Sequence, residues 1–116
     1  MIQKIDLIRE VFEQCTQIEY AEEVLLDLLS LDGSVLREAC NRLKKINNTP
    51  YCGEELQDKY GIDLSGCRKE YFDGTRMRIV WEPYKEPTQH GSIAKIWSVG
   101  PRKSEDAYRR AFKRRG

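Results

Sequence analysis

Residues 67–82 read CRKEYFDGTRMRIVWE, and this stretch decides the fold. Its two halves, 67–72 and 75–82, are rich in aromatic and β-branched residues, as strands are. Between them stands Asp73-Gly74, a pair typical of the two-residue turn that joins antiparallel strands. The stretch therefore predicts a β-hairpin.

The register of this hairpin gathers cations on one face. With a two-residue turn, Tyr71 pairs with Arg76 and Lys69 pairs with Arg78, so all four side chains share a face. The opposite face is mostly apolar and would pack against helices: Glu70, Phe72, Met77, Ile79 and Trp81. Like charges directly opposite one another are unfavourable unless an anion lies between them. The cationic face therefore predicts a phosphate site, although it also fits a solvated face whose arginines pair with Glu82 or Glu70.

The flanking segments complete a small α+β fold. Residues 92–99 form a third strand after an exposed loop at 83–91, which has two prolines and a glycine. Ser104 is placed to cap a final helix, with acidic residues at its start and basic residues at its end. The run at 109–115 fits a solvated helix end and also fits contact with RNA or a protein partner.

Two helices are expected before the hairpin. Apolar residues recur at helical spacing over 19–31 and again over 35–46. The acidic residues of the first helix lie outside its apolar face: Glu22, Glu23 and Asp27. Residues 1–18 fit a helix followed by a strand, although 9–18 alone also fit an edge strand.

Charge divides the chain into two parts. Residues 1–66 carry a net charge of −6 and residues 67–116 carry +7, which leaves +1 overall. The basic side chains are interleaved with strand-forming residues, so they are expected on a rigid surface. This asymmetry indicates a polyanionic partner.

The composition argues against membrane, secreted and metal-binding proteins. The longest apolar stretch, 24–31, is too short to cross a bilayer, and residues 1–15 do not resemble a secretory signal, so we expect a cytoplasmic protein. No C-x-x-C pair occurs and His90, in the 83–91 loop, has no second histidine, so we expect no metal and no cofactor. The cysteines are expected to be free thiols, although a disulfide between any two remains compatible with the sequence: Cys15, Cys40, Cys52 and Cys67.

The chain resembles the RelE branch of the RelE/ParE superfamily of bacterial toxins. The resemblance is carried by DLSGCRKEYF (63–72), RIVW (78–81), SVGPR (98–102) and YRRA (108–111), and the helical pair with its exit KKINNTP matches as well. It covers roughly residues 19–115 and is specific in the last fifty. It implies a RelE-like domain over 1–116, with 1–18 as a variable extension or first strand. The implied fold is a small antiparallel sheet with a helical hairpin on one side and a C-terminal helix.

The same resemblance implies a function. RelE-like toxins belong to type II toxin–antitoxin systems and cleave mRNA in the A site of the 70S ribosome without a metal ion. In that reaction the ribose 2′-OH attacks the adjacent phosphate, leaving a 2′,3′-cyclic phosphate and a 5′-OH. The implied partners are a cognate antitoxin, mRNA and the ribosome, and the implied effect is inhibition of translation.

Residue by residue, the resemblance assigns five catalytic positions. Arg78 matches the arginine that stabilises the transition state, Arg102 a phosphate clamp or acid, and Tyr108 the tyrosine that orients the nucleotide. Lys69 matches the first lysine of its strand. Tyr71 occupies the position of the general-base lysine, but a phenol with a pKa of about 10 is a poor base unless nearby cations lower that pKa. Further RNA contacts are expected from four residues: Arg76, Lys103, Arg109 and Lys113.

Two other functions fit the same fold. One is a ParE-like inhibitor of DNA gyrase, which would not need the phosphate pocket that the spacing of Arg102 and Tyr108 indicates. The other is a nucleic-acid-binding protein without catalysis, in which Tyr71, Trp81 and Trp97 stack on bases. Trp81, however, is expected on the apolar face of the hairpin.

Overall fold

The computed structural model describes residues 3–59 and 62–116. Its helices are α1 (Lys4–Gln14), α2 (Val24–Leu29), α3 (Gly33–Asn48) and α4 (Asp106–Arg115), with a short 3-10 helix η1 (Lys103–Glu105) before α4. Its strands are β1 (Ile18–Tyr20), β2 (Glu54–Glu55), β3 (Asp58–Lys59), β4 (Ile62–Asp63), β5 (Arg68–Phe72), β6 (Met77–Pro83) and β7 (Ala94–Pro101). Within the described part of the chain, no helix is long and apolar enough to cross a membrane.

The main sheet has the strand order β1-β7-β6-β5-β2. The pairs β7–β6, β6–β5 and β5–β2 are antiparallel, whereas the edge strand β1 runs parallel to β7. β3 and β4 form a separate antiparallel pair. The α+β fold expected from the sequence is confirmed, with the parallel edge strand as an addition.

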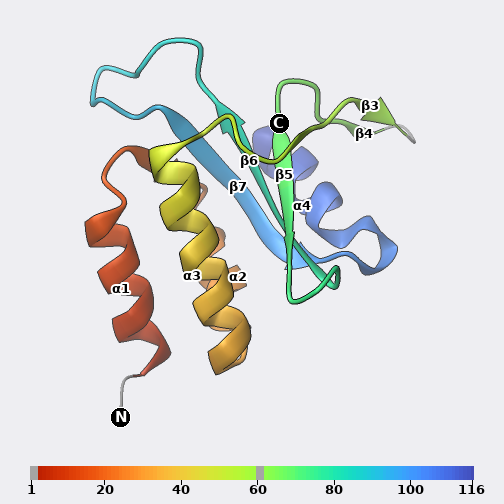
Figure 1. The fold of residues 1–116 in the computed structure, drawn as a ribbon. Helices are drawn as coiled ribbons and strands as arrows, with labels where there is room; N and C mark the ends of the chain where they lie inside the picture. Colours follow the sequence, from red (N-terminus) through yellow and green to blue (C-terminus); the bar gives the residue numbers. More distant parts are fainter. Residues whose placement is uncertain (1–2, 60–61) are drawn as a thin grey trace.

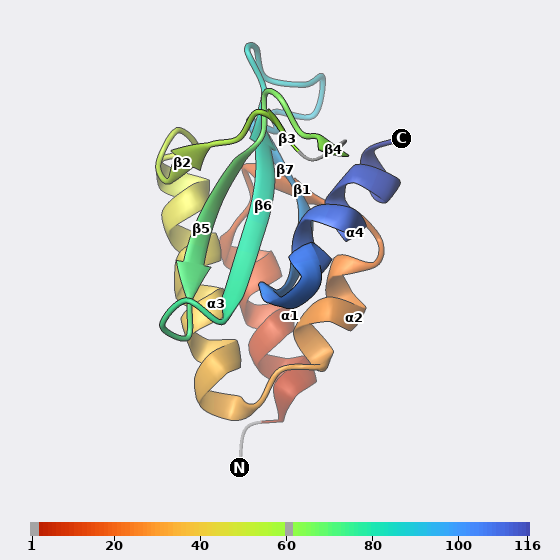
Figure 2. The same ribbon diagram turned by 90° about the vertical axis from the view of Figure 1, so that its right-hand side faces the viewer.

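Helices cover both faces of the main sheet. α1 and α3 lie on one face (Figure 1), and α4 lies on the other (Figure 2). α2 lies at the edge of β7, close to α4 (Figure 2). Phe72, Ile79 and Trp81 belong to the core formed with α1–α3, which confirms that the apolar hairpin face packs against helices. The indole of Trp81 is fully buried and donates a hydrogen bond of 2.8 Å to the Pro50 carbonyl. Trp81 is therefore a packing residue, and its suggested role in base stacking is wrong.

The register expected for the hairpin is wrong by two residues. Tyr71 pairs with Arg78 and Phe72 with Met77, so the connection contains four residues instead of two. The turn is held from outside the hairpin, because the Asp73 N–H donates to the Glu38 carboxylate at 2.7 Å. A shift of two residues preserves the faces of a strand. Lys69, Tyr71 and Arg78 therefore still share a face, whereas Arg76 leaves the sheet.

Two expected helix boundaries are also wrong. Ile18–Tyr20 forms a strand, and the Ala21 N–H extends its pairing by donating to the Ile96 carbonyl at 2.9 Å. The expected helix 19–31 therefore shortens to α2. At the other end, Ser104 makes no side-chain capping bond, because Ser104 and Glu105 both adopt positive φ values of 57° and 56°. The helix expected within residues 1–18 is confirmed by α1, whereas the strand expected after it begins only at Ile18 and extends to Tyr20.

The segment from β2 to β4 was not anticipated as structured. It begins at Gly53, whose φ is +76°, and where a Cβ atom would collide with the Lys69 carbonyl oxygen and the Trp81 ring. Glycine therefore lets the chain turn closely over the edge of the sheet before β2 pairs with β5. This path carries Glu54 and Glu55 toward the face that bears Lys69 and Arg78.

Candidate functional site

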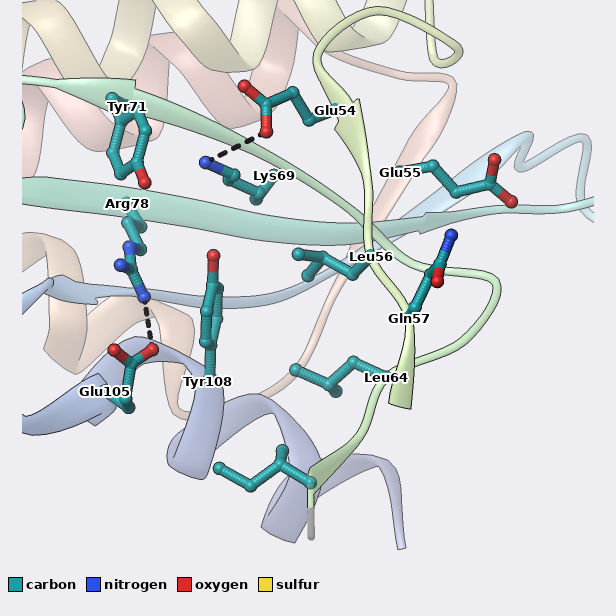
Figure 3. Close-up of a pocket in the computed structure, with 11 residues that line it drawn as sticks. Glu54, Glu55, Leu56, Gln57, Leu64, Lys69, Tyr71, Arg78, Glu105 and Tyr108 are labelled. Atoms are coloured by element: carbon teal, nitrogen blue, oxygen red, sulfur yellow. Dashed lines mark hydrogen bonds and ion pairs between the residues drawn. The ribbon is translucent and has the colours of Figure 1, made fainter. Parts of the chain in front are cut away.

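A pocket of about 380 Å³ lies on the sheet face that carries α4. Strands β5 and β6 form its floor, α4 forms one wall, and residues 54–57 with Ile62 and Leu64 form the other (Figure 3). Its lining comprises Glu54, Glu55, Leu56, Gln57, Ile62, Leu64, Lys69, Tyr71, Arg78, Glu105 and Tyr108. Four of the five expected catalytic residues are therefore brought together, and Arg102 is the exception.

Arg78 is the buried cation at the centre of this pocket. Its residue is only 4% exposed, and its Nη1 donates a hydrogen bond of 2.8 Å to the Glu105 carboxylate. The guanidinium carbon lies 4.1 Å from the Tyr108 ring centre and 5.4 Å from the Tyr71 ring centre. Its Nε is buried and has no hydrogen-bond partner among the residues that the structure describes. A buried donor without a partner costs about 1–3 kcal/mol, so this geometry favours an anionic ligand.

Lys69 supplies the second cation. It is 6% exposed, and its Nζ lies 3.6 Å from the Tyr71 ring centre and 3.3 Å from a Glu54 oxygen. Glu54 is largely exposed, so it can move away from Lys69 at little cost. Lys69 is therefore positioned to hold a phosphate beside Arg78.

The sequence also fitted a hairpin face whose arginines pair with Glu82 or Glu70, but the acidic partners of Lys69 and Arg78 are different residues. Glu70 binds Arg42 and Lys45 on the helical side, and Glu82 binds Arg115. The carboxylates in the pocket come instead from Glu54 and Glu105. Sequence reasoning missed both, because β2 is only two residues long and Glu105 reads simply as an acidic residue at a helix start.

The two tyrosines of the pocket have shifted pKa values in opposite directions. A hydrogen bond from Lys69 lowers the pKa of Tyr71, although burial opposes this shift. Burial raises the pKa of Tyr108 to about 12, and the nearby Arg78 offsets part of this effect. Tyr71 is therefore the better proton donor or acceptor of the pair.

These shifts predict an ordered titration of the phenols. Subtracting the absorbance titration of Tyr71→Phe from that of the wild type isolates the Tyr71 phenol. This phenol should ionise below the usual tyrosine pKa of about 10. The same difference for Tyr108→Phe should lie at about 12. Because the folded pKa of Tyr108 is raised, its contribution to stability is complete below about pH 10 and is lost as the pH rises through about 12. Coinciding difference curves would contradict this arrangement.

Arg102 lies outside the pocket. With Arg76 and Lys103 it lines a second, open hollow where β6 begins and β7 ends, and there the Arg102 N–H donates to the Arg76 carbonyl at 2.7 Å. The other two expected RNA contacts, Arg109 and Lys113, are exposed on α4. These five side chains form two cationic areas separate from the pocket.

The remaining arginines of α4 have a structural role that neither interpretation of the 109–115 run anticipated. Arg110 and Arg114 donate to the buried Asp27 carboxylate of α2, at 3.2 Å and 2.6 Å respectively. Ala107 and Ala111 face the sheet in the same helix and let it approach closely. These contacts fix α4 and thereby place Tyr108 over Arg78.

Six residues outside the expected catalytic set also have defined positions: His90, Trp97 and the four cysteines. His90 is exposed in the loop before β7. Trp97 is half-buried, donates to Glu82 at 3.2 Å and has Lys95 over its ring at 4.6 Å. All four cysteines are free thiols.

Comparison with known proteins identifies the fold. The chain matches no protein-family model, and no curated protein matches it significantly. Among solved structures, an arginine-to-alanine double mutant of the E. coli toxin RelE in the free state matches at 20% identity and a TM-score of 0.60, over 84% of this chain and 94% of that chain. The isolated E. coli RelE toxin matches at 18% identity and a TM-score of 0.58, over 85% and 97%. The double mutant in complex with a peptide of the antitoxin RelBc matches at 16% identity and a TM-score of 0.60, over 84% and 94%. The chain therefore has the fold of the RelE toxin.

Proposed function

We propose that this chain is the toxin of a type II toxin–antitoxin system and an endoribonuclease that cleaves mRNA. The observation that carries this proposal is the pocket in which the buried Arg78 lies against Tyr108 and beside Lys69 and Tyr71, on a RelE fold. Two cations with two phenols suit a phosphodiester and an adjacent base. Protein cations would supply the charge stabilisation that a metal ion supplies in other nucleases.

Arg78 is the group best suited to stabilise the transition state. Attack of the 2′-OH on the neighbouring phosphate builds negative charge on the non-bridging oxygens, and a preorganised guanidinium stabilises that charge without reorganising. Burial and the two aromatic rings hold Arg78 in one place. Lys69 would bind the same phosphate, and Tyr108 would orient the nucleotide.

The two outer cationic areas would bind the RNA backbone on either side of the pocket. Arg76, Arg102 and Lys103 line one hollow, and Arg109 and Lys113 extend along α4. Contacts of this kind position a strand without reading its sequence. The ribosomal A site, where the resembling toxins act, is the proposed setting for this contact.

The proposed antitoxin would cover the cationic surfaces of the chain. One of the matching RelE structures is a complex with an antitoxin peptide. An acidic segment of the partner could replace Glu54 and Glu105 on the pocket cations, since both carboxylates come from exposed or partly exposed side chains. We propose that this neutralisation occurs in the cytoplasm, where the complex would form.

Cleavage of a reporter mRNA tests the function directly. The purified chain would be incubated with the mRNA alone and with ribosomes stalled on it, and the cuts mapped by primer extension. We expect discrete cuts whose upstream fragments end in a 2′,3′-cyclic phosphate and whose downstream fragments begin with a 5′-OH.

Growth, supercoiling and RNA-binding assays separate this proposal from the two other functions that fit the fold. Growth arrest in a bacterial host without RNA cuts, together with inhibition of gyrase supercoiling, would support a ParE-like inhibitor instead. RNA binding without cuts or arrest would support a nucleic-acid-binding protein that lacks catalysis.

A further inference from the structure

The proposed reaction needs a base to remove the 2′-OH proton, and the pocket offers few candidates. Lys69 would hold the phosphate as an ammonium ion, which has no lone pair to accept a proton. Arginine has no acceptor and stays protonated, which excludes Arg78. Burial raises the pKa of Tyr108 to about 12, so its phenolate is scarce at neutral pH.

We propose that Glu105 is the general base of this site, an inference that rests on the proposed ribonuclease function. Its carboxylate lies 2.8 Å from Arg78 Nη1, so it stands directly beside the position of a phosphate bound to that guanidinium. Its side chain is 40% exposed, which leaves it accessible to a ribose hydroxyl. The RelE resemblance instead places the general base at Tyr71, and a phenol is a poor base at neutral pH.

Glu105 and a phosphate can use Arg78 at the same time. A guanidinium has five N–H donors, and among the described residues Arg78 donates a side-chain hydrogen bond only from Nη1 to Glu105. The guanidinium is also held by the Tyr108 ring, so it does not depend on Glu105 for its position. A phosphate can therefore bind Arg78 without displacing the Glu105 carboxylate. If Glu105 only blocked the site, the phosphate would have to displace it.

The backbone at Glu105 has a strained conformation, which supports a functional role for this residue. Ser104 and Glu105 are consecutive non-glycine residues with φ values of 57° and 56°, in the left-handed region that such residues rarely adopt. Strain of this kind costs on the order of 1–3 kcal/mol per residue and persists where the surrounding structure enforces it. Here it starts α4 at a point that directs Glu105 onto Arg78.

The opposite side of Arg78 supplies the acid. Tyr71 and Glu105 lie on opposite sides of Arg78 (Figure 3). In-line displacement needs the acid and the base on opposite sides of phosphorus, so the phosphate would have to bind between these two side chains. Glu54 lies instead with Lys69, on the Tyr71 side. Lys69, whose Nζ lies 3.6 Å from the Tyr71 ring centre, lowers the pKa of Tyr71 and makes it a better proton donor.

The resulting step is balanced. Glu105 takes the 2′-OH proton while the 2′ oxygen forms a bond to phosphorus and the bond from phosphorus to the 5′ oxygen breaks. The Tyr71 hydroxyl gives its proton to the departing 5′ oxygen. The products are a 2′,3′-cyclic phosphate and a 5′-OH, and proton exchange with water restores both side chains.

Separate measurement of binding and cleavage tests this role. Glu105→Gln, Glu105→Ala and the control Glu86→Gln, an exposed loop residue, would be compared with the wild type in whichever condition the wild type cleaves. Single-turnover cleavage would be measured on the reporter RNA. Binding would be measured on a fully 2′-O-methylated oligonucleotide of the same sequence, which lacks the attacking hydroxyl.

We expect Glu105→Gln to slow cleavage by about 10²–10⁴-fold, the range of a lost proton transfer, while binding stays equal or tightens. Formate should partly restore Glu105→Ala, and Glu86→Gln should match the wild type. Faster cleavage by Glu105→Gln would mean that the Glu105 carboxylate blocks the site in the wild type. A parallel loss of binding and cleavage would mean that Glu105 only maintains the structure of the site. Either result overturns the proposal while leaving the ribonuclease function intact. A wild type that never cleaves would remove both.

Discussion

Arg78→Ala should lower the single-turnover rate of RNA cleavage by about 10³-fold or more, whereas Arg102→Ala should lower it by less than about tenfold. Removal of an arginine that stabilises charge on a transferring phosphoryl group costs about 10³–10⁵-fold in rate. Arg78 has the required position, because it is buried at the centre of the pocket between two tyrosines. Arg102 lines a separate open hollow, so its loss should weaken binding of the RNA backbone.

Salt dependence separates the two arginines further. Each phosphate contact that is lost reduces the slope of log affinity against log salt, by about 0.7 for single strands. Arg102→Ala should show that reduction with little change in the rate of the bound complex. Arg78→Lys keeps the charge but not the planar fork, so it should recover only part of the rate. Arg37→Ala, an exposed change on α3, is the matched control.

Equal losses in the two variants would contradict this assignment. They would mean that Arg102 reaches the reacting phosphate, as the resemblance to RelE implies, and that its side chain moves into the pocket when RNA binds. Unchanged cleavage in Arg78→Ala would remove the pocket from the reaction altogether. Thermal unfolding of each variant would show whether a lost rate reflects lost folding.

The face of the hairpin could be predicted from the sequence, but its register could not. Alternation of side chains fixes which residues of a strand share a face, so Lys69, Tyr71 and Arg78 were correctly grouped. Asp73-Gly74 suggested the tightest turn, and Asp73 does adopt a positive φ of 51°. The turn is nevertheless longer because α3 reaches it through Glu38, a tertiary contact with no local signal.

The carboxylates of the site could not be predicted for a similar reason. Glu54 reaches Lys69 through a two-residue strand that owes its path to Gly53, and Glu105 reaches Arg78 through two left-handed residues. Neither segment has hydrophobic periodicity, which is the signal that revealed the longer elements. The sequence therefore indicated the cations of the pocket but not the acids that pair with them.

Asp27 illustrates the same limit in the core. An acidic residue beside a helical apolar stripe is normally solvated, yet Asp27 is only 5% exposed. β1 pairs with β7 only as far as Ile96, so the edge of β7 beyond it is open. The Asp27 carboxylate closes that edge by accepting a hydrogen bond of 3.0 Å from the Val99 N–H. This role depends on strand lengths that no local pattern encodes.

Asp27→Ala should lower the free energy of unfolding by about 3–5 kcal/mol, the cost of removing one partner from a buried ion pair. The substitution leaves the Val99 N–H and the guanidinium groups of Arg110 and Arg114 without their shared acceptor. For a chain of this length the melting temperature should fall by roughly 10–20 °C. Urea and thermal unfolding, followed by circular dichroism, measure both quantities.

Glu23→Ala is the control, because Glu23 also pairs with Arg114 but at 3.9 Å and from a side chain that is 53% exposed. An exposed pair of this kind contributes less than about 1 kcal/mol. A loss below that value for Asp27→Ala as well would show that water replaces the carboxylate and that α4 is held by its apolar face alone. With the larger loss, Asp27 binds α2, β7 and α4 into one unit. Cleavage by Asp27→Ala should then fall together with folding, whereas Arg78→Ala should lose cleavage without a comparable loss of stability.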